Sequence, residues 1–77
     1  MKTDEKAYED LLAERNELNV RISRLDHFCR NVQNISRLSL HQKVLMGVQL
    51  QAMKTYREVL TARAADIQLY GSDGSKQ

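Results

Sequence analysis

The fold is decided by residues 39–70, which read SLHQKVLMGVQLQAMKTYREVLTARAADIQLY and form the longest uninterrupted helical pattern in the chain. Two apolar rows repeat every seven residues along it. The first consists of Met46, Met53, Leu60 and Ile67, and the second of Leu45, Ala52 and Val59. Residues seven apart share one side of an α-helix, so each row marks one face. Because one partner helix cannot cover both rows, we expect one row to face the first helix and the other to face another chain.

Both ends of this helix carry local signals. Ser39 followed by Gln42 three residues later matches a capping box, which predicts that the helix begins there. Gly71 suits the position just beyond a helix C-terminus. We therefore predict a helix over 39–70 and a flexible polar tail over 71–77.

The preceding residues predict a first helix over about 4–33 and a turn over 34–38. Its apolar stripe steps by three and four residues and contains Tyr8, Leu11, Arg15, Leu18, Ile22, Leu25, Cys29 and Val32. A short connection between two helices makes them antiparallel neighbours. The predicted fold is all-α, with residues 1–77 as a single domain. It is an antiparallel, coiled-coil-like two-helix hairpin that assembles into a homo-oligomeric helical bundle.

Size and cysteine content also favour an oligomer. A domain of 77 residues buries little apolar surface and usually needs disulfides, a metal or oligomerisation. Cys29 is the only cysteine, and it forms no metal-ligand spacing with His27 or His41. Oligomerisation is the remedy that is left. A lone cysteine without a targeting segment also predicts the cytoplasm, and the longest apolar run, residues 44–46, predicts no membrane span.

Charge is unevenly distributed, although the net charge is only +2. Acidic residues gather within residues 1–20 and basic residues within 21–43, an order that suits the macrodipole of the first helix. The basic residues near the turn are Arg24, Arg30, Arg37 and Lys43. The sequence leaves open whether they bind anything. The small net charge and the lack of a short recognition helix argue against binding of duplex nucleic acid.

Signatures of catalysis are missing from the sequence. The three glycines are isolated, so they form no phosphate-binding loop. Asp26, His27 and Cys29 lie within one helical turn, which directs their side chains apart. The sequence therefore predicts a binding protein without a cofactor, and not an enzyme.

Tyrosine and arginine side chains on the second helix suit a nucleotide, because a ring can stack on a base and a guanidinium can hold a phosphate. The candidate ligand-binding residues are Arg63, Tyr56, Arg57, Arg15 and Lys54. Two structural alternatives stay open. The stem of Arg15 could cover the contact between the helices while its charge reaches an acidic neighbour. The tyrosine and arginine side chains of the second helix could equally form contacts between helices.

Residues 38–63, LSLHQKVLMGVQLQAMKTYREVLTAR, resemble the second half of small helical-hairpin proteins of phages and prophages, including crAss-like phages. The resemblance is carried by the pattern A-M-x-x-Y-x-x-x-L-x-x-R from Ala52 to Arg63 and by Phe28 near the end of the first helix. It covers most of residues 8–67. His41 and Gln42 depart from it, since acidic residues are frequent at these two places in that family.

The resemblance, taken with the fold, implies similarity to anti-defence sponges, which antagonise CBASS and Thoeris immunity. Such proteins are oligomers that sequester a nucleotide second messenger without cleaving it. The expected function is therefore sequestration of a cyclic oligonucleotide or a cyclic ADP-ribose type of signal at inter-chain pockets of a homo-oligomer, in the host cytoplasm. The alternative is an interaction module that binds a host or virion protein through an apolar helical face.

Overall fold

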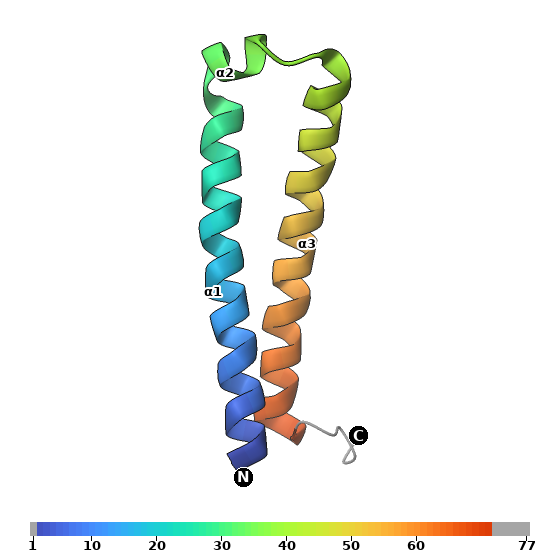
Figure 1. Ribbon diagram of the computed structural model, residues 1–77. Coiled ribbons are helices and arrows are strands. Elements are labelled where there is room, and N and C mark those ends of the chain that lie inside the picture. Colours follow the sequence, from blue (N-terminus) through green and yellow to red (C-terminus); the bar gives the residue numbers. More distant parts are fainter. Residues whose placement is uncertain (1, 72–77) are drawn as a thin grey trace.

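The chain forms an antiparallel helical hairpin in a computed structural model that describes residues 2–71, and the side chains from Asp4 onward (Figure 1). Helix α1 (Lys2–Arg30) is followed by a short α2 (Val32–Ser36) and by α3 (Leu40–Tyr70). The hairpin measures 51 × 19 × 13 Å. Within residues 2–71 every regular element is an α-helix, so the all-α prediction is confirmed. The predicted tail falls, apart from Gly71, outside the described residues.

The ends of α3 form as the sequence predicts. The Ser39 Oγ accepts a hydrogen bond from the backbone N–H of Gln42 at 3.1 Å, which satisfies one of the free N–H groups of the first turn. Gly71 ends the helix with a φ of 90°, a conformation that costs glycine little, and its N–H donates to the Ile67 carbonyl at 2.9 Å.

The turn differs from its predicted position. Helix α1 ends at Arg30 rather than near residue 33, and the predicted boundary region holds the separate helix α2. Asn31 causes the break, because its side chain accepts hydrogen bonds from the backbone N–H groups of Gln33 at 3.0 Å and Asn34 at 3.2 Å. An Asn side chain offers the backbone an alternative to continuing the helix. Val32, predicted on the buried stripe, is consequently 79% exposed.

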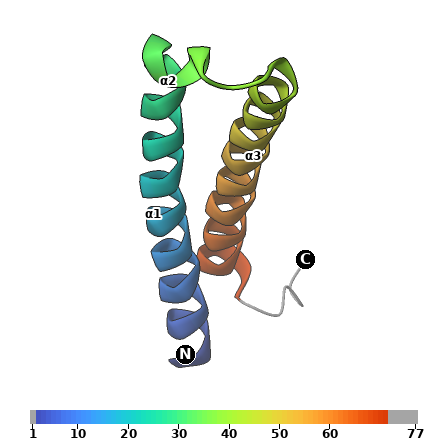
Figure 2. The ribbon, with the colours of Figure 1, turned by 45° about the horizontal axis from the view of Figure 1, so that its top comes forward.

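The core is small and lies toward the end of the hairpin where α1 begins and α3 ends. Its members are Leu11, Leu18, Ile22, Leu60 and Ala64, and only Leu60 among them has no exposed surface. Figures 1 and 2 show α1 and α3 close together at this end and diverging toward α2. Met53 and Ile67 pack against the core beside Leu60, so of the two apolar rows of α3 it is theirs that faces α1.

The second apolar row of α3 points away from α1. Leu45 and Val59 are each 47% exposed, Val48 beside them is 61% exposed, and Ala52 is exposed as well. A contiguous apolar face of this kind usually marks an interaction site. Leu45, Ala52 and Val59 therefore form the exposed row of the two. That this row binds a partner outside the hairpin stays a prediction.

Ion pairs contribute little to this fold. Arg21 pairs with Glu17 at 2.9 Å, and Arg30 pairs with Asp26 at 2.9 Å, both between residues four apart on α1. Exposed pairs of this kind stabilise a helix by less than about 1 kcal/mol. The pair with Asp26 gives Arg30, one of the four basic residues near the turn, a structural role.

Leu60→Ala should lower the free energy of unfolding by about 2–5 kcal/mol, because it leaves a cavity at the one fully buried side chain. Urea denaturation followed by circular dichroism at fixed protein concentration measures the change. Leu40→Ala is the matched control, since Leu40 is 77% exposed and its loss should cost no more than about 0.5 kcal/mol. Equal effects of the two substitutions would contradict this placement of the core.

Ser39→Ala should destabilise the hairpin by about 1 kcal/mol, because the N–H of Gln42 loses its acceptor. Ser39→Asp keeps an acceptor at the same position and should remain close to the wild-type stability in the same denaturation experiment. If Ser39→Asp lost as much stability as Ser39→Ala, the hydrogen bond would not be the cause.

Candidate functional site

An open groove lies between α1 and α3, in the half of the hairpin where the two helices diverge (Figure 2). Its volume is about 780 Å³, within the range of about 300–1,000 Å³ that ligand pockets occupy. The groove is lined by Leu18, Arg21, Arg24, Leu25, Phe28, Met46, Gln49, Met53 and Tyr56. Apolar side chains that would meet in the core of a closed hairpin line this open groove instead.

The lining combines an apolar floor with a few polar groups. Two guanidinium groups, from Arg21 and Arg24, line it from α1, and the Gln49 amide lines it from α3. The aromatic rings of Phe28 and Tyr56 are 36% and 44% exposed. Rings that present a free face can stack on a planar group, while guanidinium groups bind phosphate or carboxylate oxygens in a fork geometry.

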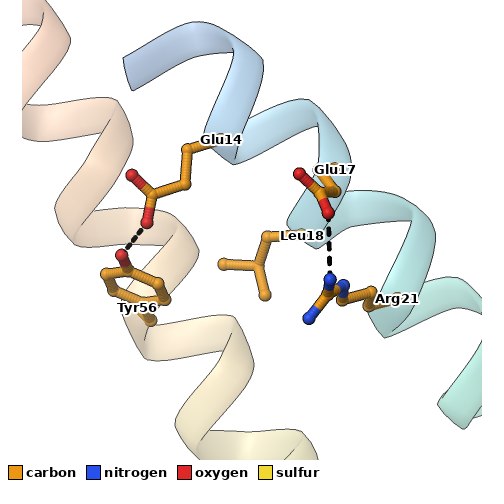
Figure 3. Close-up of a pocket in the computed structure, with 5 residues that line it drawn as sticks. All are labelled: Glu14, Glu17, Leu18, Arg21 and Tyr56. Atoms are coloured by element: carbon orange, nitrogen blue, oxygen red, sulfur yellow. Dashed lines mark hydrogen bonds and ion pairs between the residues drawn. The ribbon is translucent and has the colours of Figure 1, made fainter. Parts of the chain in front are cut away.

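A smaller pocket of about 250 Å³ continues the groove toward the core and shares Leu18, Arg21 and Tyr56 with it (Figure 3). Two hydrogen bonds flank Leu18 in this pocket. The Tyr56 hydroxyl donates to the Glu14 carboxylate across the two helices, and the Arg21 Nη2 donates to the Glu17 Oε1 at 2.9 Å. The first of these bonds fixes the position of the Tyr56 ring relative to α1.

The pKa of Tyr56 is raised above the ordinary value of 10.0, mainly because its hydroxyl donates to the Glu14 carboxylate, with desolvation and the negative charge of Glu14 adding to the effect. Arg63 acts in the opposite direction and lowers this pKa. A raised pKa means that the hydrogen bond stabilises the fold below about pH 10 and is lost as the pH rises through the raised value. At neutral pH the tyrosine is therefore a neutral hydrogen-bond donor.

The five candidate residues from the sequence do not form one cluster. Tyr56 lines the groove, and Arg63 is close enough to affect its pKa. Arg63 also lines a neighbouring surface pocket of about 430 Å³ together with Val59 and Asp66. These two residues lie on the side of the hairpin where the groove opens.

The other three candidates lie on the opposite side of the contact between α1 and α3. Successive side chains on a helix diverge by about 100°, so Arg57 points away from Tyr56. Its Nη1 donates to the Asn19 Oδ1 at 3.0 Å. Arg15 is four residues before Asn19, and Lys54 three before Arg57, so both share this side.

The sequence leaves two roles open for Arg15, which are binding of an anion and covering of the contact between the two helices. Its side chain is half-buried, and its Nη2 donates to the Asn16 Oδ1 at 3.4 Å. Its Nε is buried without a hydrogen-bond partner. Arg15 therefore covers the contact between the helices with its stem, and the acidic partner anticipated for it is replaced by an amide.

Sequence reasoning missed most of the groove. Arg21 was not among the candidate residues, Arg24 was noted as part of the basic turn, and Phe28 was noted for the resemblance and not as a ligand-binding residue. The signal that could have found them is their spacing, since Arg21, Leu25 and Phe28 follow Leu18 at steps of three and four residues along one edge of the buried stripe.

Metal sites and membrane spans are both absent from the part of the chain that the structure describes. Within residues 2–71 no group of three or more His, Cys, Asp or Glu side chains could hold a metal ion. None of the described helices has the length and apolar character needed to cross a membrane.

Comparison with known proteins identifies the family. The Sequestin family model matches residues 5–66 of the 77. The chain belongs to the Sequestin family. The match covers nearly all of α1, all of α2 and most of α3, so every residue that lines the groove lies inside the Sequestin region. The name Sequestin indicates sequestration of a ligand, in agreement with a sponge-like role. Neither a curated protein nor a solved structure matches this Sequestin.

Glu14→Gln should lower the pKa of Tyr56, because the amide removes the negative charge that opposes formation of the phenolate. The measurement is an ultraviolet titration of phenolate absorbance in a Tyr8→Phe/Tyr70→Phe background, where Tyr56 is the only tyrosine. Glu17→Gln is the control, since Glu17 bonds to Arg21 rather than to the phenol. An unchanged pKa in Glu14→Gln would show that the two side chains do not interact in solution.

Proposed function

We propose that this Sequestin is a phage anti-defence protein that sequesters a nucleotide second messenger, of the cyclic oligonucleotide or cyclic ADP-ribose type, in the cytoplasm of the host cell. The groove is the observation that carries the proposal. Arg21 and Arg24 hold the phosphates, Phe28 and Tyr56 stack on a base, and Gln49 bonds to polar edges of the ligand. Membership of the Sequestin family supports the sequestering role.

The protein holds this ligand without converting it. Apart from two carboxylates, the groove and the smaller pocket are lined by apolar, aromatic, arginine and glutamine side chains. The carboxylates are already engaged, Glu14 with the Tyr56 hydroxyl and Glu17 with Arg21. A site of this composition suits binding of an anion more than general acid–base chemistry, which needs a free group near the reacting atom.

The ligand is enclosed between chains of a homo-oligomer. A typical pocket buries about 70–90% of the surface of a small-molecule ligand. The groove of a single hairpin is open, with Phe28 and Tyr56 36% and 44% exposed, and leaves much of a ligand's surface in solvent. A second copy beside α3 would narrow the opening of the groove. It would also cover the exposed apolar row of α3 and add to a core that holds five buried side chains.

A second candidate function is favoured by the same exposed row. Leu45, Val48 and Val59 could bind a host or virion protein instead of another copy. A purified chain that is a stable oligomer and binds a nucleotide would argue against this alternative. A monomeric chain that binds none of the nucleotides would favour it.

Isothermal titration calorimetry against cyclic dinucleotides and cyclic ADP-ribose isomers tests the proposal. Arg24→Ala should raise the Kd of the bound nucleotide roughly ten- to hundredfold, since a charge-assisted hydrogen bond contributes about 1.5–3 kcal/mol. Arg30→Ala is the control, because Arg30 pairs with Asp26 and does not line the groove. The released ligand should be chemically unchanged by mass spectrometry.

Failure has a defined form for each part of the proposal. Absence of binding across the whole panel would contradict nucleotide sequestration. Equal losses for Arg24→Ala and Arg30→Ala would place the ligand elsewhere, and a converted nucleotide would make the protein an enzyme. Arg57→Ala separates the two sides of the hairpin, since a larger loss there than in Arg24→Ala would assign the ligand to the side of Arg15 and Lys54.

A further inference from the structure

Helix α3 carries a second stripe that fits a coiled coil, here called the outer stripe. It runs through positions 41, 45, 48, 52, 55, 59, 62 and 66, in steps of alternately four and three residues. Its large apolar members are exposed, with Val48 at 61% and Leu45 and Val59 at 47% each. Steps of four and three over four turns or more keep a stripe facing one partner helix, so this face is built for a helix.

The outer stripe is complementary to itself when it is read in the opposite direction. Reversal about the midpoint between residues 53 and 54 pairs position 41 with 66, 45 with 62, 48 with 59, and 52 with 55. Leu45 thereby meets a small residue, Ala62, and the two valines meet each other. A two-fold dimer requires such self-complementarity, because the same surface serves both partners.

The ends of the outer stripe add polar complementarity. Reversal brings His41 of one chain opposite Asp66 of the other, so an imidazole faces a carboxylate at each end. In a parallel pair the same residues would face their own kind, and the two Asp66 carboxylates would repel each other. At the centre, Ala52 and Thr55 are small enough to let the two helices approach closely.

We propose that a second copy of this chain covers the outer stripe, with the two α3 helices antiparallel about a two-fold axis that passes between Ala52 and Thr55. The inference rests on the homo-oligomer of the proposed function and gives it a face, a direction and a register. Each α3 then lies between the α1 of its own hairpin and the α3 of the other copy. The dimer is a four-helix arrangement.

This register also concerns the ligand site. Gln49, Tyr56 and Arg63 line the edge of the outer stripe that borders the groove, each four residues after an outer-stripe position. A two-fold axis perpendicular to the helices keeps this edge on the same face in both copies. The two grooves therefore open on one face of the dimer, and the second copy presents its own Gln49 and Tyr56 beside the first groove.

Disulfide cross-linking in a Cys29→Ser background tests the direction and the register. One protein carries Leu45→Cys, the other carries Ala62→Cys, and one of the two is isotopically labelled, because both positions lie far enough from the two-fold axis to be distant from their own copies. After mixing and mild oxidation, the main product should be the mixed disulfide dimer, because position 45 faces position 62 of the other copy. Each protein oxidised alone should give several-fold less dimer, and reductant should reverse the cross-link.

The other outcomes are equally defined. Efficient cross-linking of each variant with itself would indicate parallel helices and overturn the proposal. An oligomer by light scattering that gives no mixed cross-link would place the interface elsewhere, leaving the oligomer of the proposed function intact. A monomer at all concentrations would overturn both the interface and the oligomer, while nucleotide binding would still be judged by calorimetry on the wild-type chain.

A charged variant provides a second measurement that does not depend on oxidation. Ala52→Glu places a carboxylate near the two-fold axis in each copy and should convert the dimer to a monomer while its helical circular dichroism is retained. Gln68→Glu introduces the same charge at an exposed position outside the outer stripe and should leave the dimer intact. Dissociation by both variants, or by neither, would contradict the assignment.

Discussion

The contact of Leu60 and Ala64 with the buried leucines and isoleucine of α1 is the interaction on which the rest of the hairpin depends. It holds the helices together near the chain ends, while α2 and its flanking residues hold them apart at the other end (Figure 1). Two helices joined in this way diverge along their length. The groove is a direct result of that divergence, because Met46 and Phe28 lie where the helices no longer meet.

The same contact divides the polar residues between two sides. Once Leu60 faces α1, Tyr56 must lie at one edge of the contact and Arg57 at the other, since a helix turns by about 100° per residue. The edge with Tyr56 borders the groove and the exposed apolar row, and the edge with Arg57 is joined to α1 through Asn19. The groove and the outer stripe therefore share one region of α3.

Local features of this fold could be predicted from the sequence, and features that depend on the distance between helices could not. Ser39 and Gly71 mark the ends of α3 by their own chemistry, and the spacing of Met53, Leu60 and Ile67 places them toward α1. The break at Asn31 could be placed only approximately, near residue 33, because an asparagine is tolerated within a helix as well as at its cap. Arg24 was missed because its place in a groove arises from the divergence of the helices, which no local pattern encodes.

The position of the core has a consequence for how the chain closes. Leu11 and Ala64, members of one cluster, are far apart in the sequence, whereas residues close to the turn bury little surface. Closing such a long loop costs conformational entropy before any burial repays it. The turn end, which buries the least surface, should consequently be the first part of the hairpin to open in hydrogen exchange. A deletion that removes Leu11 from α1 or Ala64 from α3 therefore removes part of the core contact that holds the two helices together.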